Sequence, residues 1–448
     1  EDRPFVLADH LPELVEGLVV LTPSVHLLRA LAAELGPARP DGPYLAAEIV
    51  AHDPPEVRAA LVAEAKHLGR PIVGTHRVFL ERPSQHEVHR TRLAIAHLTF
   101  LADVVPGATG REGHPMDLVP DTAWLLPPAR AAQAFADLPE AAHATLEVAE
   151  RLAFRLRRSP HPRLPSLDPS VLGLGDRNVS PAERREAAYG RLAARAIEGL
   201  RRRYARLTPA AMARLEMELR VIQQRGFADY FLIVDELVAF AREQGIPTVG
   251  RGSAASSIVA YALGITSVDP LRHELPFERF LSPERKDCPD IDLDLDWRGR
   301  DAVIRHAYAT YGEDRVAMIA THVTFQARAA VREVARTRGL PPDEIGRVTG
   351  HLPHRLGPLL TGRARPPELA GVDMGVEPWR GVLRSALALD GLPRHMGLHV
   401  GGIVIGDGPL ADSLPLERSA MGRIATQFEM HGVEATGLGW STIVGISS

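Results

Sequence analysis

The sequence predicts a multidomain protein that combines α/β and α+β architecture, including a mixed sheet. Its 448 residues correspond to about three ordinary domains at roughly 150 residues each. Short apolar runs alternate with helical stretches near the amino end, and an acidic strand follows several long helices near the middle. An apolar share of 45% and a charged share of 24% are typical of a globular protein with substantial cores.

The first 95 residues have the pattern of an α/β layer. Apolar runs at 17–21 and 71–73 are predicted strands, and residues 55–68 form a helical stretch between them. Residues 96–160 are alanine-rich and are predicted to be mostly helical. The segment 159–165 contains three prolines, which break helical periodicity, so we interpret it as a linker.

Long helices are predicted next, over 181–207 and 210–225, and they lead into a dense apolar core segment at 226–234. The first of these helices is rich in arginine. Its arginines are Arg184, Arg185, Arg191, Arg195, Arg201, Arg202, Arg203 and Arg206. Such a series forms either a solvated helix face or a contact with a phosphate backbone, and both interpretations stay open.

A glycine- and serine-rich loop, GRGSAASS at 250–257, precedes an apolar helix predicted over 258–263. Small residues at a helix start leave backbone N–H groups accessible, and these groups and the helix dipole suit an anion such as a triphosphate. The loop lacks the lysine of a Walker A motif and the spacing of a dinucleotide fingerprint. A structural tight turn is therefore the alternative.

The run PDIDLDLD at 289–296 places four aspartates at a spacing of two. On a strand these carboxylates would share one face, with Ile291, Leu293 and Leu295 on the other. Like charges side by side repel, so a bound cation is the best explanation of the pattern. Carboxylates that hold paired Mg²⁺ ions are the device of two-metal phosphoryl transfer, and a structural or calcium-type site is the alternative.

Other features exclude several classes. The pairs His86 with His89 and His395 with His399 lack the arrangement of a zincin site. The single cysteine, Cys288, excludes an internal disulfide and favours a reducing cytoplasm. The sequence shows neither a signal peptide nor an apolar run of about 18 residues, so no membrane is indicated. The net charge of -4 argues against nucleic-acid binding through overall charge, although a local basic channel remains open.

From about residue 160 to 438 the chain resembles the catalytic alpha subunit of bacterial DNA polymerase III, a C-family DNA polymerase. The segments that carry the resemblance are GFADYFLIVDELVAFA at 226–241, GRGSAASSIVAYALGITSVDPL at 250–271, FERFLSPER at 277–285, PDIDLDLD at 289–296 and LPRHMGLHVGGIVI at 392–405. The last segment and the arginine-rich composition are similar to the error-prone branch of that family.

The resemblance implies a partial PHP-type α/β barrel over 1–160, followed by a nucleotidyltransferase-type palm with a mixed sheet over 161–322. It further implies a helical thumb over 323–397 and a second palm segment over 398–448. The implied activity is that of a replicative or error-prone DNA-directed DNA polymerase in the cytoplasm. Its implied partners are primer–template DNA, deoxynucleoside triphosphates and other replisome subunits.

The implied site contains six residues. By position in the motif, Asp290 and Asp292 would be the catalytic ligands of Mg²⁺, and Asp294 lies where some relatives lack a carboxylate. Gly252 and Ser253 would hold the phosphates of the nucleotide, and Arg251 and Arg279 would contribute positive charge. On the implied thumb, Arg328, Arg332 and Arg336 follow one another at four-residue spacing and are predicted contacts of the duplex backbone.

The chain also departs from the family pattern. The family's second palm segment ends in a strand that carries a lysine and a third catalytic aspartate, whereas residues 439–448 read GWSTIVGISS. We expect a truncated chain that lacks this strand's residues, the fingers and the early PHP motifs. In addition, the run at 76–79 reads HRVF where many relatives have Asn-Asp-Val-His, so phosphoesterase activity is not expected.

Three functions therefore compete. The first is a DNA polymerase that extends a primer by two-metal catalysis. The second is a catalytically dead remnant that binds DNA or a partner, which the missing third aspartate favours. The third is a nucleotidyltransferase with a small-molecule acceptor, against which the thumb-like segment and the arginine-rich helices argue.

Overall fold

The computed structural model describes residues 7–38, 42–153, 155, 165–175, 179–282, 291–352, 375–436 and 443–447. The chain divides into two compact units. The first unit contains residues 1–155 and 325–392, and the second contains residues 156–324 and 393–448. Residues 159–164 of the predicted linker at 159–165 lie outside the described residues.

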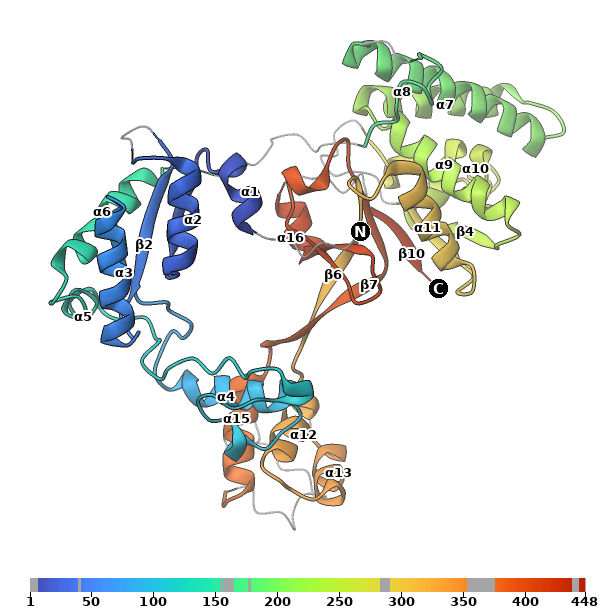
Figure 1. Ribbon diagram of the computed structural model, residues 1–448. Helices are drawn as coiled ribbons and strands as arrows, with labels where there is room; N and C mark the ends of the chain where they lie inside the picture. Colours follow the sequence, from blue (N-terminus) through green and yellow to red (C-terminus); the bar gives the residue numbers. More distant parts are fainter. Residues whose placement is uncertain are drawn as a thin grey trace. The chain divides into compact units, whose positions relative to one another are not determined.

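The first unit contains a parallel sheet in the order β1-β2-β3 (Figure 1). Its strands are β1 (Val19–Thr22), β2 (Tyr44–Val50) and β3 (Ile72–Thr75), connected by the helices α2 (Val25–Leu35) and α3 (Pro55–His67). Ser24 begins α2, because its side chain accepts a hydrogen bond from the backbone N–H of Leu27. The predicted alternation of strands and helices in the first 95 residues is confirmed.

The prediction of a mostly helical segment over 96–160 is wrong for residues 97–127. This stretch contains the short 3₁₀ turns η1 (Leu101–Asp103) and η2 (Arg111–Gly113) and otherwise runs as loops. Prolines interrupt it, and Gly107 and Gly113 adopt positive φ, which ends helical geometry in spite of the alanine content. Helices return with α5 (Pro128–Gln133) and α6 (Pro139–Arg151).

A helical core in the same unit combines an early helix with later ones. Its helices are α4 (Gln85–Ala96), α12 (Ala327–Thr337), α13 (Pro342–Gly350) and α15 (Trp379–Leu389). Ile95 of α4 is buried together with Val334 of α12 and Leu383 of α15. The indole Nε1 of Trp379 donates to Glu344 at 2.8 Å, which ties α15 to α13. The amino-terminal α1 (Leu7–Leu14) contacts α2.

Helices form most of the amino-terminal half of the second unit. They are α7 (Pro181–Arg203), α8 (Pro209–Arg225), α9 (Ala228–Glu243), α10 (Ile258–Leu263) and α11 (Arg300–Tyr311). The predicted bounds of α7, α8 and α10 agree closely with these, and the apolar segment at 226–234 forms the start of α9. A Cβ at Gly199 of α7 would lie 2.1 Å from the carbonyl oxygen of Ala262, so this glycine permits α7 and α10 to approach closely.

Seven described strands form a mixed sheet in the order β4-β5-β10-β7-β6-β9-β8. They are β4 (Thr248–Arg251), β5 (Ile291–Leu295), β6 (Val316–Thr324), β7 (Pro393–Ile405), β8 (Leu416–Arg418), β9 (Ile424–Glu429) and β10 (Ile443–Ser447). Strand β10 runs parallel to β5 and antiparallel to β7. Residues 393–397 of the predicted thumb lie in β7.

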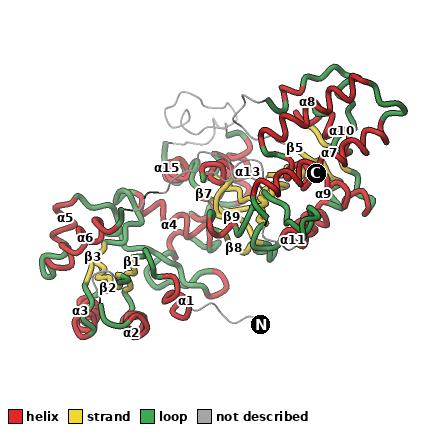
Figure 2. Tube along the Cα trace, turned by 90° about the horizontal axis from the view of Figure 1, so that it is seen from above, coloured by secondary structure: helices red, strands yellow, loops and turns green. Residues whose placement is uncertain are grey.

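The two faces of this sheet differ. Ile291, Leu293 and Leu295 of β5 belong to the core that includes residues of α7 through α11. On the other face, near β6 and β7, a smaller core includes Ile319 and Val433 and is covered by the helix α16 (Met430–Ala435) and the turn η6 (Leu410–Asp412). Figure 2 shows the strands in yellow among the red helices of this unit. None of the helices described here is long and apolar enough to cross a membrane.

Candidate active site on the acidic strand

The acidic run forms strand β5, and its residues alternate between buried and partly exposed positions as predicted. Ile291, Leu293 and Leu295 are buried, whereas Asp292 and Asp294 are partly exposed on the opposite face. Predicted ligand Asp290 lies outside the described residues. The strand therefore presents two described carboxylates on the face opposite the core that contains residues of α7 through α11.

Neighbouring strands determine what surrounds these carboxylates. In the ladder with β4, Arg251 lies directly opposite Asp292 and Val249 opposite Asp294. The Nε atom of Arg251 lies 3.0 Å from Oδ1 of Asp294, so the arginine forms an ion pair with the diagonal acid. On the other side, Gly445 of β10 lies opposite Asp292.

The loop after β4 turns beside Asp292. Residues Gly252–Ser256 form a 3₁₀ turn, η3, and Gly252 has a φ of +73°. A Cβ at this position would lie 3.7 Å from Oδ2 of Asp292. Gly250 is also required, because a Cβ there would lie 2.5 Å from the carbonyl oxygen of Ile265. The structure thus brings Gly252 and Ser253 next to the acidic strand.

The N-terminus of α10 is not an accessible anion site. The expectation that the small residues of the loop leave its N–H groups accessible to a triphosphate is therefore wrong for this helix. Ser257 caps the helix and accepts a hydrogen bond from the N–H of Ala260. The carboxylate of Glu218, which is fully buried, accepts from the N–H of Val259 at 3.2 Å and from the Ser257 hydroxyl at 2.8 Å. An internal carboxylate already complements this end of the helix. Any phosphate contact of the loop must therefore come from η3 upstream.

Glu218 also pairs with Arg214, one turn earlier on α8. Arg214 Nε donates to Oε1 of Glu218 at 2.7 Å. Burial raises the pKa of Glu218, and the hydrogen bonds from Ile258, Arg214 and Ser257 oppose that rise. Neither residue was predicted from the sequence. Their i, i+4 spacing on a predicted helix could have indicated an ion pair between them.

Arg279 lies at the end of a second turn, η4 (Phe277–Arg279), and its side chain is exposed. The turns η3 and η4 contact each other, although 20 residues separate Ser256 from Pro276 in sequence. Phe277 and Phe280 are buried on either side of Arg279 and anchor the turn to the core. Five of the six predicted site residues thus lie on β4, β5 and two contacting turns: Arg251, Gly252, Ser253, Asp292 and Arg279.

A tyrosine on α9, whose role was not predicted from the sequence, holds the beginning of strand β5. The buried hydroxyl of Tyr230, on α9, accepts a hydrogen bond from the backbone N–H of Ile291 at 3.1 Å. This bond holds the residue next to Asp292 against the helical layer. Tyr230 lies in the predicted core segment 226–234. Its ring is buried there, and its hydroxyl holds the backbone of β5.

The arginine-rich helix α7 is largely occupied by contacts within the protein. Arg191 donates to the carbonyl oxygen of Val171 at 2.7 Å, and Arg195 pairs with the buried Asp235. Arg203 donates to the carbonyl oxygen of Thr266 and lies 4.6 Å from the ring centroid of Tyr261. These contacts favour a structural role for much of the series over a phosphate contact.

On α12, the three predicted duplex contacts are all exposed, as expected for residues four apart on one helix face. Arg328 donates to the carbonyl oxygen of Leu352 at 3.0 Å, and Arg336 lies 3.4 Å from Glu333.

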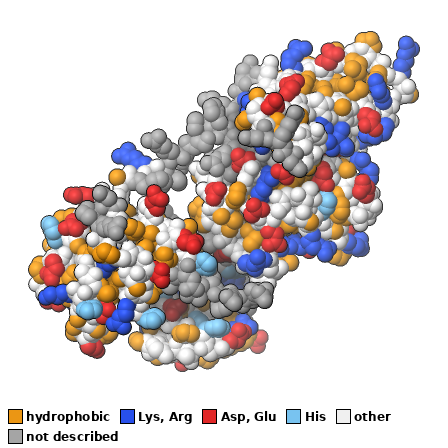
Figure 3. All heavy atoms as spheres, turned by 45° about the horizontal axis from the view of Figure 1, so that its top comes forward, with side chains coloured by type: hydrophobic (Ala, Val, Ile, Leu, Met, Phe, Trp, Pro, Cys, Tyr) orange, Lys and Arg blue, Asp and Glu red, His pale blue; other side chains and the backbone are white. Residues whose placement is uncertain are grey.

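On the face seen in Figure 3, blue arginine side chains are interspersed with red acidic ones. This mixture agrees with a net charge of -4 and limits any basic surface to local areas.

The two histidine pairs make backbone contacts. His86 Nε2 lies 3.0 Å from the carbonyl oxygen of Val119, and His89 Nε2 accepts from the N–H of the same residue at 3.2 Å. His399 Nδ1 accepts from the N–H groups of Gly401 and Gly402.

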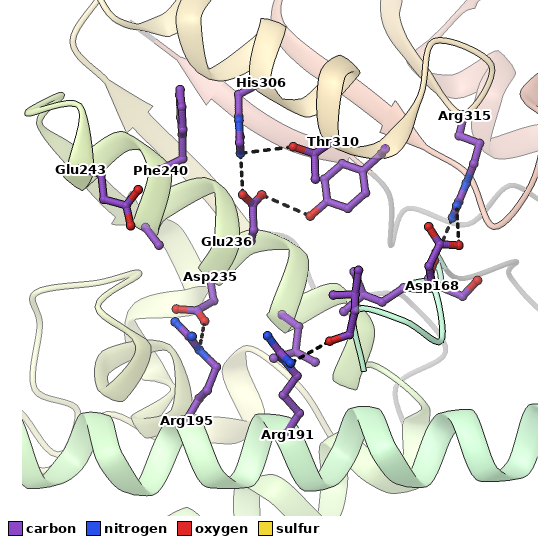
Figure 4. A pocket seen from close by; sticks show the side chains of 16 residues that line it. Asp168, Arg191, Arg195, Asp235, Glu236, Phe240, Glu243, His306, Thr310 and Arg315 are labelled. Atoms are coloured by element: carbon purple, nitrogen blue, oxygen red, sulfur yellow. Dashed lines mark hydrogen bonds and ion pairs between the residues drawn. The ribbon is translucent and has the colours of Figure 1, made fainter. Parts of the chain in front are cut away.

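The helical side of the second unit contains a cavity of about 260 Å³ between α7, α9 and α11 (Figure 4). Three pairs of its titratable side chains lie close together: Arg195 with Asp235, Arg315 with Asp168, and His306 with Glu236. The ring of His306 stacks on Phe240 with a centroid separation of 3.8 Å. The helices that line the cavity cover the apolar face of the sheet, so it is separate from the acidic face.

The described part of this site offers carboxylate oxygens that could bind Mg²⁺. Within the described ranges, no three His, Cys, Asp or Glu side chains form a group that could hold a metal ion. Asp292 is the one predicted ligand among these residues. Its carboxylate faces the turn at Gly252, and carboxylate oxygens are the donors that Mg²⁺ prefers. Asp294 is already engaged by Arg251, so Asp292 is the better ligand of the two described acids.

A comparison with known proteins identifies the family. The sequence profile described as "Bacterial DNA polymerase III alpha NTPase domain" matches residues 190–439. This segment is more than half of the chain and includes β4, η3, η4 and β5. The chain belongs to the bacterial DNA polymerase III alpha family. The resemblance predicted from the five sequence segments is thereby confirmed.

Relatives within the DNA polymerase III alpha family carry two kinds of name. The "Error-prone DNA polymerase" of Symbiobacterium thermophilum is 37% identical over 375 residues, which cover 83% of this chain and 32% of the relative. The "DNA polymerase III subunit alpha" of Pseudomonas aeruginosa is 33% identical over 470 residues, which cover 96% of this chain and 37% of the relative. The "DNA polymerase III subunit alpha" of Thermus aquaticus is 43% identical over 262 residues, which cover 56% of this chain and 22% of the relative. The chain thus spans about a third or less of the length of these relatives.

Proposed function

We propose that this chain contains the nucleotide-adding core of a DNA-directed DNA polymerase, with primer–template DNA and deoxynucleoside triphosphates as substrates. The observation that carries the proposal is the arrangement of Asp292 beside Gly252. A carboxylate that suits Mg²⁺ lies beside a glycine turn, since a Cβ at Gly252 would lie 3.7 Å from Oδ2 of Asp292. The relatives' names support this function, and both replicative and error-prone polymerases are among them.

In this function, Asp290 and Asp292 would hold Mg²⁺, which when bound stabilises the charge of the triphosphate and of the leaving pyrophosphate. The backbone of Gly252 and Ser253 would contact the phosphates, and Arg279 would contribute positive charge from the neighbouring turn. Arg251 acts through Asp294, because their ion pair limits the negative charge near the incoming nucleotide.

The domain assignment belongs to the same proposal. We assign residues 1–160 to a partial PHP-like domain, 161–322 to a first palm segment, 323–397 to a thumb and 398–448 to a second palm segment. The parallel sheet of β1 to β3 and its helices support the first assignment. The mixed sheet around β5 supports the palm, and the helices α12, α13 and α15 support the thumb. Other replisome subunits and a cytoplasmic location follow from this function.

A remnant that binds DNA or a partner without catalysis is the second candidate. Strand β10 lies beside β5, and its sequence IVGIS contains no carboxylate. The third acid that the family pattern calls for is therefore not present in this strand. This observation favours the remnant, because two-metal catalysis depends on several carboxylates.

Primer extension with the purified chain separates the two candidates. If the polymerase proposal is correct, the chain extends a primer with Mg²⁺ and Asp292→Ala abolishes extension. The matched control is Asp296→Ala, at the end of the same acidic run, because Asp296 accepts from the backbone N–H of Arg298 and serves the local turn. A chain that retards primer–template DNA in a gel and never extends it supports the remnant instead.

A further inference from the structure

One helix contacts both of the turns that carry the proposed triphosphate residues. The turns η3 and η4 come from separate stretches of sequence, and α8 lies earlier in the chain than either. From α8, Arg214 reaches both stretches with side-chain hydrogen bonds, and Glu218 pairs with Arg214 and accepts hydrogen bonds just after η3. This arrangement raises the question of whether the pair does more than fill the core.

Arg214 makes the connection between the two stretches. Its Nη2 atom donates to the carbonyl oxygen of Ser256, at the end of η3, at 2.9 Å. The same atom donates to the carbonyl oxygen of Leu275, just before η4, also at 2.9 Å. The guanidinium lies 5.9 Å from the ring centroid of Phe277, within η4. A single planar group thus fixes both backbones at once.

Glu218 orients Arg214 and holds the other end of the loop. Its Oε1 accepts from Arg214 Nε, while its Oε2 accepts from the Ser257 hydroxyl and the Val259 N–H. Its side chain is 0% exposed, and that of Arg214 is 18% exposed, so little water competes for these bonds. All of these neighbours are donors, which is the arrangement that a carboxylate satisfies and an amide does not.

We propose that the Arg214–Glu218 pair is a positioning element that sets the spacing between the η3 and η4 turns and thereby the affinity for a deoxynucleoside triphosphate. The effect on nucleotide affinity rests on the proposed polymerase function. The effect on the spacing of the two turns concerns the folded protein alone. Neither residue is a catalytic residue, because both act through the backbone of the turns.

A second ion pair in the same unit provides a matched control. Arg195 of α7 pairs with Asp235 of α9, and the Asp235 side chain is 6% exposed (Figure 4). This pair joins two helices and, among the described residues, donates no hydrogen bond to the backbone of either turn. Asp235→Asn therefore reports the general cost of losing a buried carboxylate in this unit.

The first experiment measures amide hydrogen exchange of the whole chain for wild type, Glu218→Gln, Arg214→Lys and Asp235→Asn. We expect exchange in 252–257 and 275–280 to accelerate about tenfold or more in the first two variants and to stay at the wild-type rate in Asp235→Asn. Equal exchange in all four proteins, or equal acceleration by the control, overturns the positioning role. If Glu218→Gln fails to fold, Ser257→Ala replaces it, because it removes one donor to Glu218 and leaves the ion pair.

The second experiment measures equilibrium binding of a fluorescent deoxynucleoside triphosphate with Mg²⁺, and binding of primer–template DNA, to the same proteins. We expect nucleotide Kd to rise about tenfold in Glu218→Gln and Arg214→Lys, with DNA Kd unchanged. An unchanged nucleotide Kd overturns the link between spacing and affinity. If wild type itself binds no nucleotide, the proposed function fails, and the exchange experiment still decides the positioning role.

Discussion

The Nε atom of Arg251 lies 3.0 Å from Oδ1 of Asp294, although Asp292 is the residue directly opposite Arg251 in the β4–β5 ladder. The strand's repulsion between like charges is therefore relieved in part by an arginine of the protein itself. This leaves Asp292 as the described acid that a metal ion would engage. The two aspartates lie on the same face of one strand, and we expect them to have different roles.

The first prediction concerns these two acids. We expect Asp292→Asn to lower the single-turnover rate of primer extension by about 100-fold or more, as for the loss of a group that stabilises transition-state charge. Asp294→Asn changes the rate by about fivefold at most, because a partly exposed ion pair contributes about 1 kcal/mol or less. Equal losses in both variants would contradict the assignment of different roles.

The second prediction concerns the turn beside Asp292. Gly252→Ala forces a side chain into positive φ, which destabilises the fold by about 1 kcal/mol, and places a methyl group near the acid. Gly245→Ala is the control, because Gly245 has a φ of +67° with open space around it. We expect the same fall in Tm for both variants and a higher nucleotide KM for Gly252→Ala alone. A higher KM in both would assign the effect to backbone strain.

The third prediction concerns the pH dependence of stability. Burial raises the pKa of Asp229 above its ordinary value of 3.8, and its Oδ1 accepts from the N–H of Leu167 at 2.9 Å. The unfolded chain therefore releases this proton at a lower pH than the folded protein. Stability from this group is complete below the ordinary pKa and is lost as pH rises through the raised value.

The measurement is the free energy of urea unfolding across this pH range for wild type and Asp229→Asn. The variant keeps an acceptor oxygen for Leu167 and has no proton to lose. We expect the fall in stability with rising pH to be shallower in the variant, by at most about 1.4 kcal/mol per pH unit. Parallel curves for the two proteins would show that Asp229 titrates as it does in the unfolded chain.

The fourth prediction concerns the exposed arginine face of α12. If it contacts the duplex backbone, Arg332→Ala weakens binding of any primer–template sequence and reduces the slope of log Kobs against log salt by about 0.9. The control is Arg130→Ala, an exposed arginine on α5 in the same unit. Fluorescence anisotropy titrations at several salt concentrations measure both. An unchanged slope for Arg332→Ala would remove α12 from the DNA interface.

Much of the second unit could be predicted from sequence, because its signals are local. Alternation by two in β5 and the apolar residues of α10 each depend on neighbouring residues. The loop segment at 97–127 was missed because alanine content favours helix while prolines and glycines with positive φ decide the backbone. The roles of Tyr230 and Glu218 were also missed, since each depends on a partner that lies far along the chain.

The position of β10 has a consequence for the order in which the protein folds during translation. Strand β10 separates β5 from β7, so the sheet is continuous only once residues 443–447 have joined it. Ile291 pairs with Val444, about 150 residues later. Until that late segment leaves the ribosome, β4 is the neighbour of β5 among the described strands, and the helices behind them must hold the β4–β5 pair in place. The acidic strand therefore acquires its second neighbour only about 150 residues after it has itself been synthesised.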